Sequence, residues 1–438
     1  MRESVRLALV ALLAAGTITG AACGEDGDRS ANIRPAVPLE SSGCSPVSYG
    51  GEGRPDFLIA TSTALQGQFT DHGVQVSQAL KMVLDERDWR AGDYTVGLQI
   101  CGETTAAGDA ASPERCRSNA KAFVANRSVI VVHGPLFSTC SRYATPILNR
   151  APGGPLAQVV AGPTYLGLTR DGPGVAPREP ERYSATGRRS LVRLAPPDDT
   201  MGAAGAIFAE RRGARSVFVL DDNDPYGFAV AESFRLAAER LGLRVVGRAK
   251  WDPQASDYLG LAGRVEASGA DAVYLGGYVF SNGPQLIKDL RESLGGDVEI
   301  IGPDGFNQLA PIIEGAGAAA EGFAPMIAVL PSRELPPDGQ DFVARFEERF
   351  GARPCCFSVH TAQATHMMLD AIADSDGSRG EVLDNLFEAQ VEGGYVGDFQ
   401  IDRYGDTTLN TIAVYRIEDG KLRFETAIRP PADLLARR

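Results

Sequence analysis

The chain has 438 residues, with 43 Lys and Arg against 56 Asp and Glu, so its formal net charge is −13. Hydrophobic residues make up 44% and charged residues 23%, which is typical of a globular protein and excludes a disordered, collagen-like or coiled-coil chain. Such a length predicts two or three domains of about 100–200 residues each. The acidic balance argues against nucleic acid or an anionic membrane surface as a partner, because both attract clustered Lys and Arg.

The first 22 residues have the pattern of an export signal. Arg2 and Arg6 precede an apolar run over 7–18, which is too short to span a bilayer, and small residues then lead to Cys23. This segment resembles a bacterial lipoprotein signal, which implies cleavage before Cys23 and lipidation of Cys23; a plain secretory signal is the alternative. Residues 23–54 are rich in Gly, Ser, Pro, Asp and Glu and are predicted to form a flexible tether.

From residue 56 onward, short apolar runs alternate with amphipathic stretches of helical period. The expected strands of a first series are 57–65, 94–101, 129–132 and 156–160, with helices over 73–89 and from the Ser112-Pro113 start. A second series begins after Arg193, with expected strands at 216–220, 244–250, 272–275 and 299–301. Strands that alternate with helices of this length indicate parallel sheets covered on both faces. Two such series indicate an α/β protein with two doubly wound lobes.

The segments that follow the expected strands are the places to look for a binding site, because ligands of open parallel sheets bind beyond the carboxyl ends of the strands. Each of five such segments combines a Gly or Pro turn with an aromatic, hydroxyl or carboxylate side chain: 133–141, 161–165, 221–227, 276–278 and 302–306. In the first, Ser138, Thr139 and Ser141 stand at an expected helix start, where hydroxyls and amides suit a carboxylate. Simple N-capping by Ser138 or Ser141 is the alternative.

Signals for catalysis and for metal binding are missing from the sequence. It contains no phosphate-binding loop, nucleophile elbow, zinc-protease motif or EF-hand loop. Cys355 and Cys356 are adjacent, and the histidines have no spacing that pairs them on a metal, so we expect no enzyme activity, no cofactor and no metal site. Besides Cys23 there are six cysteines, and this even number favours disulfides in an exported protein, although 15 pairings are open.

The succession of segments resembles the substrate-binding proteins of branched-chain amino acid ABC importers, the leucine/isoleucine/valine-binding family. The matching residues spread over 56–421 and comprise 57–73, 134–138, 164–169, 224–227, 275–278 and 302–306. The resemblance implies a type I periplasmic-binding-protein fold, with two Rossmann-like lobes joined by three hinge crossings near 193–195, 322–326 and 396–399. Lobe 1 would comprise 55–193 and 326–397, lobe 2 would comprise 194–325 and 398–425, and 426–438 would be a C-terminal tail.

The resemblance also implies a set of ligand-binding residues: His72, Ser138, Gly162, Thr164, Tyr226, Tyr278 and Asp304. Ser138 would bind a carboxylate, Thr164 both the carboxylate and the amino group, and Asp304 the ammonium. Gly162 would offer its carbonyl to the ammonium, and Tyr226 and Tyr278 would cover the ligand. Asp304 is one methylene shorter than the glutamate common in the family, and His72 stands where an aromatic ring is usual, so the ligand's identity stays open.

The implied function is that of a monomeric, extracytoplasmic solute-binding protein. It would capture an amino acid or a similar amphipathic molecule and deliver it to an ABC permease and ATPase, held at the outer face of the cytoplasmic membrane by its lipid anchor alone. The family also suggests a disulfide from Cys140 to Cys101 or Cys116, with Cys44 as a further candidate. A ligand-sensing receptor with the same clamp is the alternative.

Overall fold

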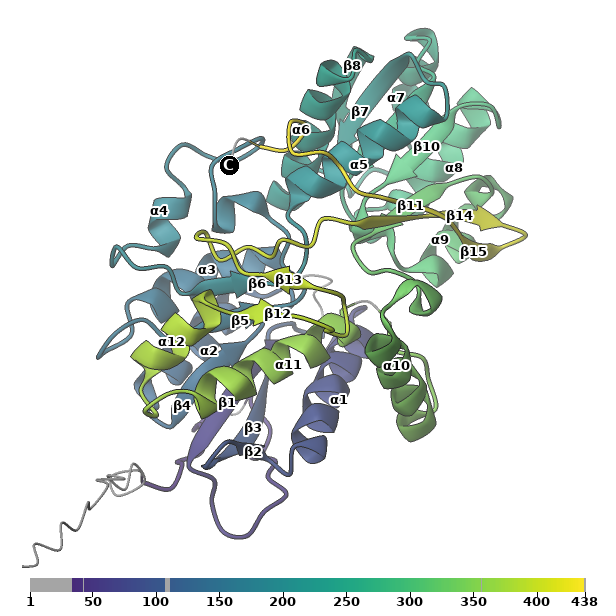
Figure 1. The fold of residues 1–438 in the computed structure, drawn as a ribbon. Helices are drawn as coiled ribbons and strands as arrows, with labels where there is room; N and C mark the ends of the chain where they lie inside the picture. Colours follow the sequence, from purple (N-terminus) through teal and green to yellow (C-terminus); the bar gives the residue numbers. More distant parts are fainter. Residues whose placement is uncertain (1–33, 42, 107–110, 356, 437–438) are drawn as a thin grey trace, which may run out of the picture. The chain divides into compact units, whose positions relative to one another are not determined.

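The computed structural model describes residues 34–41, 43–106, 111–355 and 357–436, and its contacts define one unit from Pro35 to Arg438. Within this unit, two sheets carry the helices that pack against them (Figure 1). The first sheet has the strand order β2 (Arg90–Ala91), β3 (Tyr94–Gly102), β1 (Phe57–Thr63), β4 (Val129–His133), β5 (Gln158–Val160) and β6 (Leu191–Arg193). All of its pairings are parallel except that of β2 with β3.

Helices from two distant parts of the chain cover the first sheet. They are α1 (Thr70–Glu86), α2 (Pro113–Ala125), α3 (Ser138–Asn149), α4 (Pro180–Tyr183), α11 (Ser358–Ala373) and α12 (Arg379–Phe387). Leu58 and Ala60 of β1 share one hydrophobic core with Phe123 of α2 and Leu148 of α3. Residues two apart in a strand face the same side of a sheet, so this core lies on one face of the sheet. Helix α11 also packs against α1 and against α12.

The second sheet has the strand order β15 (Lys421–Ile428), β14 (Ile412–Glu418), β11 (Ala324–Ile327), β10 (Glu299–Gly302), β9 (Ala272–Gly276), β7 (Ser216–Asp221) and β8 (Arg244–Lys250). Its helices are α5 (Asp198–Arg211), α6 (Pro225–Arg240), α7 (Leu259–Ala267), α8 (Gly283–Leu294) and α9 (Leu309–Ala316). Strand β14 is antiparallel to both of its neighbours, β11 and β15, while the other pairings are parallel. The remaining elements are β12 (Gln390–Val391), β13 (Phe399–Gln400) and α10 (Pro337–Phe350).

Strand β7 shows why a continuous apolar run forms here. Val217 and Val219 face the core that contains Phe208 of α5 and Phe234 of α6. Phe218 and Leu220 face the opposite core, with Leu261 of α7 and Leu286 of α8. Because helices bury both faces, every residue of the strand is apolar or hydrogen-bonded rather than alternating with exposed polar residues. Burial on both faces is what the expected doubly wound lobes require.

A buried ion network marks the place where the chain passes between the two sheets. Arg193, at the end of β6, is fully buried and donates to Asp406 over 3.0 Å and 2.6 Å, and to the carbonyl of Tyr165 over 2.8 Å. Arg170 pairs with the same Asp406 at 2.7 Å. Residues 398–407 therefore stay with the first sheet, and the third connection follows them, later than the expected crossing at 396–399. The second connection starts after β11, beyond the expected 322–326.

The described part of the expected tether is packed against the first sheet. Ala36 and Leu39 are buried, and the Gln99 side chain bonds the backbone N–H and the carbonyl of Leu39 at 2.7 and 3.2 Å. Cys44 forms a disulfide with Cys101. These long-range bonds hold in place a segment that is poor in apolar residues. This packing differs from the flexible tether that the sequence predicts. The expected signal over 1–22 and the lipidation of Cys23 lie outside the described residues.

The C-terminal segment also differs from a free tail. Strand β15 runs to Ile428, and Leu434 and Leu435 are buried in the core that α5 and α6 share. Arg240 donates to the carbonyls of these two leucines. The expected tail from 426 onward is thus part of the second sheet and its core.

A second disulfide joins Cys116 of α2 to Cys140 of α3. Of the two partners that the family resemblance suggests for Cys140, the structure selects Cys116. The amide of Cys355 donates to Gln75 at 2.6 Å. None of the described helices is long and apolar enough to cross a bilayer.

Candidate functional site

An inner cavity of about 60 Å³ collects the residues implied by the resemblance. All seven line it: His72, Ser138, Gly162, Thr164, Tyr226, Tyr278 and Asp304. The loops after β4 and β5 and the start of α1 supply four of them, while the loops after β7, β9 and β10 supply the other three. This is the arrangement expected when the carboxyl ends of parallel strands meet a ligand. The lining is completed by Phe69, Leu136, Phe137, Gly305, Asn307 and Phe357.

Ser138 presents a hydroxyl donor to the cavity. Ser138 is the first residue of α3. No side chain caps the start of this helix, so N-capping by Ser138 or Ser141, the alternative to ligand binding, is not observed. Its Oγ instead accepts from the amides of Thr164 and Tyr165, each at 3.2 Å. Because a hydroxyl has two acceptor sites and one proton, these bonds leave the O–H free to donate. A donor at a helix N-terminus suits a carboxylate oxygen.

A buried glutamate that sequence reasoning missed fixes the loop before Ser138. Glu103 is fully buried after β3 and accepts from the amides of Leu136 and Phe137 at 3.1 and 3.2 Å, and from Ser62 Oγ at 2.9 Å. Burial raises the pKa of Glu103 to about 7, although these hydrogen bonds oppose the rise. A Cβ on Gly134, whose φ is +80°, would lie 2.4 Å from the carbonyl oxygen of Ser62, so this tight loop requires glycine.

The second sheet contributes an acidic side chain to the inner cavity. Asp304 follows β10, is 8% exposed, and accepts a hydrogen bond from the Tyr226 hydroxyl. Burial raises the pKa of Asp304 to about 6, and the Tyr226 bond counteracts part of that rise. The Tyr226 hydroxyl also accepts from the amide of Gly305 at 3.1 Å, which fixes its orientation. The carboxylate is thus held in a dry site where a cation gains more than it would at the surface.

Asp198 is a second buried carboxylate, close enough to Asp304 to interact with it electrostatically, and sequence reasoning missed it as well. It is fully buried at the start of α5, and its backbone amide donates to the carbonyl of Thr164 at 2.9 Å. A side-chain hydrogen bond with Thr164 and the charge of Arg193 favour its ionised form. Burial raises the pKa of Asp198 to about 8, and the charge of Asp304 adds to the rise. Both Asp198 and Glu103 follow strands, so the rule used for the other loops could have found them.

Aromatic rings form part of the wall of the inner cavity. Tyr226 packs on Tyr278 with 4.6 Å between ring centroids, and Tyr278 stacks on Phe280 at 4.6 Å. Phe69 meets Phe280 at 5.3 Å and the His72 ring at 5.2 Å. Burial lowers the pKa of His72 to about 4, so this ring is neutral at pH 7 and acts as an aromatic surface. The walls of the cavity are therefore suited to an apolar ligand body.

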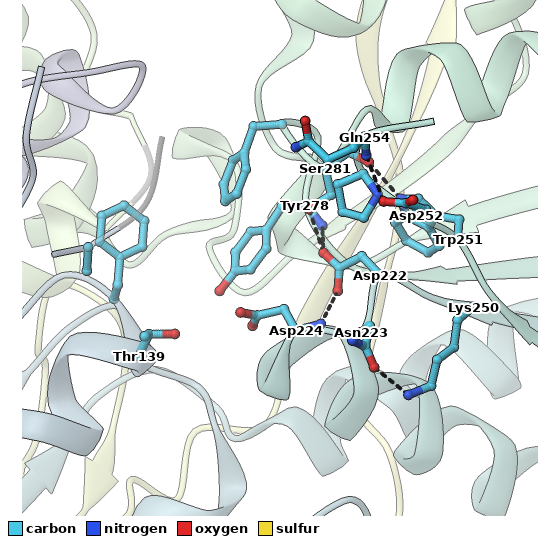
Figure 2. A pocket seen from close by; sticks show the side chains of 14 residues that line it. Thr139, Asp222, Asn223, Asp224, Lys250, Trp251, Asp252, Gln254, Tyr278 and Ser281 are labelled. Carbon is cyan, nitrogen blue, oxygen red and sulfur yellow. Dashed lines mark hydrogen bonds between the residues drawn. The ribbon is translucent and has the colours of Figure 1, made fainter. Parts of the chain in front are cut away.

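A larger outer cavity of about 680 Å³ adjoins the inner one and shares Phe137 and Tyr278 with it. Figure 2 shows Asp224 and Tyr278 facing Thr139 across this space. Asp222 anchors Tyr278 by accepting from its amide at 3.2 Å and from Ser281 Oγ at 2.7 Å (Figure 2). Tyr278 is thus a fixed partition between the two cavities. Among the described residues, no group of His, Cys, Asp and Glu has the arrangement of a metal site.

This fold and site define a class of protein: two α/β sheets whose loops jointly enclose a small cavity lined by a hydroxyl and a carboxylate. A family model described as Periplasmic binding protein matches residues 59–421, and the chain belongs to this family. The family and the two-lobed α/β fold expected from the sequence are thereby confirmed. Members of the family are binding proteins that act outside the cytoplasm.

Individual relatives are distant in sequence and close in fold. An amino acid binding protein of Pseudomonas aeruginosa is 24% identical over 346 residues, which cover 76% of this chain and 86% of that protein. The leucine binding protein LivK from Thermotoga maritima has a TM-score of 0.71 at 21% identity, covering 85% of this chain and 99% of that one. A solute binding protein of an ABC transporter from Rhodopseudomonas palustris, solved with p-hydroxybenzoic acid, has a TM-score of 0.69 at 15% identity, covering 86% and 98%.

Proposed function

We propose that this protein is the extracytoplasmic solute-binding component of an ABC importer, which captures an amino acid or a similar small amphipathic molecule between its two lobes and delivers it to the permease. The observation that carries the proposal is the polarity of the inner cavity. A free hydroxyl donor, Ser138, and a buried carboxylate, Asp304, both line it and come from loops of different sheets. An α-amino acid has the matching pair of groups, a carboxylate and an ammonium.

In this proposal the ligand carboxylate accepts from the Ser138 hydroxyl at the start of α3, and Thr164 lies beside it. The ammonium pairs with Asp304 and faces the carbonyl of Gly162. Tyr226, Tyr278 and the neutral ring of His72 enclose the apolar part. A charge pair in this dry cavity contributes more than a surface pair, which is worth about 0–1 kcal/mol.

The cellular setting is part of the same proposal. An export signal over 1–22 and a lipid on Cys23 would hold the protein at the outer face of the cytoplasmic membrane, where a monomer meets the permease and its ATPase. A ligand-sensing receptor that uses the same two lobes is the alternative. The names of the relatives, an amino acid binding protein and ABC transporter proteins, favour transport.

Aromatic acids are the second ligand class to consider, because one structural relative was solved with p-hydroxybenzoic acid. The buried Asp304 disfavours them, since a ligand without an ammonium would leave this carboxylate unpaired in the cavity. An amide or amine cargo would leave the Ser138 hydroxyl without its anion. A zwitterion offers a partner to both groups.

A thermal-shift screen of the purified mature protein tests the proposal. The panel holds the twenty L-amino acids, their amides, and benzoate and hydroxybenzoates at equal concentration. A ligand that binds only the folded state stabilises that state by RT ln(1+[L]/Kd). We therefore expect one or more amino acids to raise the melting temperature clearly more than their amides do. A response to aromatic acids alone, or to no member of the panel, would contradict the proposal.

A further inference from the structure

A third cavity, of about 50 Å³, lies where the chain passes between the two sheets, and we call it the hinge cavity. Pro196 of its lining comes from the connection between β6 and α5, and Ala328 from the connection that follows β11. Leu409 and Thr411 come from the connection between β13 and β14. All three connections between the lobes therefore contribute to this wall. Because such connections absorb the changes in φ and ψ when lobes move, the hinge cavity changes shape as the lobes open or close.

His360 brings a polar ring into this mostly apolar lining. It lies in the first turn of α11, is 3% exposed and lines the hinge cavity. Its Nδ1 has no hydrogen-bond partner among the described residues. Burial lowers the pKa of His360 to about 4, so the ring is neutral at pH 7. Nδ1 is then unpaired in either tautomer, as a donor or as an acceptor, and an unpaired buried polar atom disfavours the conformation that buries it.

The place of this unpaired atom distinguishes it from the others in the molecule. Among the described side chains with buried polar atoms that lack a partner, His360 alone lines one of the three cavities. His133 is a useful contrast, because its Nε2 is also unpaired. The Nδ1 atom of His133 bonds Thr61 at 3.1 Å within the first sheet, and His133 lines none of these cavities. The unpaired atom of His360 thus lies in the part of the molecule that moves.

The structure shows the lobes in contact beside the inner cavity. Phe280, from the loop after β9, meets Phe69, which precedes α1, with 5.3 Å between ring centroids. Phe357 links this region to the hinge: it lines the inner cavity, its ring meets that of His360 edge-on at 5.9 Å, and it shares a core with Ala328. The unpaired Nδ1 therefore belongs to a conformation in which loops of both sheets enclose the inner cavity.

We propose that His360 is a hinge residue that opposes closure of the lobes, because closure buries its Nδ1 without a partner. This inference rests on the proposed function and adds to it a control of affinity from outside the inner cavity. The ligand-free protein stays open, and bound cargo supplies the free energy that closure requires. A ligand that binds only the closed form has an apparent affinity reduced by the fraction of protein that is closed. His360 thereby lowers the affinity for cargo without touching it.

The variants separate the polarity of His360 from its volume. His360→Phe and His360→Met remove the unpaired nitrogen, and the hinge cavity leaves room for these side chains. His360→Gln keeps a polar group at the same place. His366→Phe is the matched control, because it makes the same change on the same helix at a residue that does not line the hinge cavity.

Calorimetry with the tightest-binding L-amino acid of the screen gives the first readout. We expect His360→Phe and His360→Met to bind it at least about fivefold more tightly than the wild type, since they remove an unsatisfied buried group. His360→Gln and the His366→Phe control should stay within about twofold of the wild type. An equal gain in His360→Gln would overturn the inference, because the polarity of the side chain would then have no role.

Small-angle X-ray scattering of the ligand-free proteins gives a second readout that needs no cargo. We expect the wild type and the His366→Phe control to become more compact when the amino acid is added, and His360→Phe and His360→Met to be more compact than the wild type without it. A merely structural role of His360 would change urea unfolding and leave this radius of gyration unchanged. An unchanged radius and an unchanged affinity in both apolar variants would overturn the inference while solute binding stands. If no amino acid binds but the apolar variants are more compact, the proposed cargo is wrong and the role of His360 stands.

Discussion

The hydroxyl of Tyr226 donates a 2.5 Å hydrogen bond to Oδ1 of Asp304 inside the inner cavity. This bond favours the ionised carboxyl, because a donated hydrogen bond lowers its pKa against the effect of burial. The Tyr226→Phe variant keeps the ring on Tyr278 but removes the donor. Since hydrogen bonds to charged groups contribute about 1.5–3 kcal/mol, we expect about 10–100-fold weaker amino-acid binding by calorimetry.

Tyr274→Phe is the matched control for this change. Tyr274 is a buried tyrosine of β9, and its hydroxyl has no hydrogen-bond partner in the described part of the chain. Removing that hydroxyl should leave the affinity within about twofold. Equal losses in the two variants would show that the Tyr226 bond to Asp304 has no specific role.

Ser138→Ala tests the hydroxyl donor of the inner cavity. The change removes the free O–H and also the acceptor of the Thr164 and Tyr165 amides. We expect calorimetry to show at least tenfold weaker binding of the amino acid and little change for its carboxamide. Ser141→Ala is the control, because Ser141 is a buried serine of the same helix whose hydroxyl has no partner among the described residues. A loss that is the same for acid and amide would contradict the carboxylate assignment.

The stability of the ligand-free protein should rise as the pH falls from 9 to 7. Burial raises the pKa values of Asp198 to about 8 and of Glu103 and Asp222 to about 7, far above the value near 4 of unfolded carboxyls. The folded state therefore binds more protons than the unfolded state in this range, which makes unfolding harder as protons are added. Below about pH 6.5 the buried histidines, with lowered pKa values, act in the opposite direction.

Scanning fluorimetry across this range checks the sign. We expect a melting temperature that is a few degrees higher at pH 7 than at pH 9, and a smaller difference in Asp198→Asn. A melting temperature that falls between pH 9 and pH 7 would mean that these carboxyls are not buried as described.

Removing either disulfide should lower stability, but only the removal of one of them should also weaken ligand binding. Cys116–Cys140 ties α2 to the first turn of α3, two residues from Ser138, whereas Cys44–Cys101 ties the N-terminal segment to β3. We expect either double alanine variant to lose about 2–4 kcal/mol in urea unfolding. Only Cys116→Ala/Cys140→Ala should also weaken amino-acid binding. An affinity loss confined to the other pair would place the sensitive region elsewhere.

Asp406 is expected to be indispensable for stability. It neutralises Arg193 and Arg170, which are both buried, so Asp406→Asn leaves two guanidinium groups without their anion. Breaking such a pair typically costs about 3–5 kcal/mol, measurable by urea unfolding. Asp419→Asn serves as control, because Asp419 is 87% exposed and its ion pair is screened by solvent. Comparable losses in both variants would argue against the buried network.

Sequence patterns predicted the parts of the fold that local rules determine. The apolar runs became β1, β4 and β7, and Ser112 caps α2 as expected from the Ser-Pro start. The loops after the strands converge in space because parallel strands end on one side of a sheet. His72 lies on α1 and lines the same cavity, and only the family resemblance predicted it as a ligand-binding residue.

Features that depend on distant partners could not be predicted. Asp406 and Arg193 are 213 positions apart, and their pairing moves the third connection beyond the expected crossing. Residues 35–54 look like a linker by composition, yet Gln99 and Cys101 bind them to β3. Asp198 looks like any acid at a helix start, and nothing in the local sequence predicts that its side chain is fully buried.

A crystal structure of the protein with the tightest-binding amino acid of the screen tests the central claim most directly. The account predicts the ligand carboxylate within hydrogen-bond distance of Ser138 Oγ and the ammonium within hydrogen-bond distance of an Asp304 oxygen, with the side chain against Tyr278. A ligand bound in the reverse orientation, or seated wholly in the outer cavity without contact to Ser138 and Asp304, would contradict it.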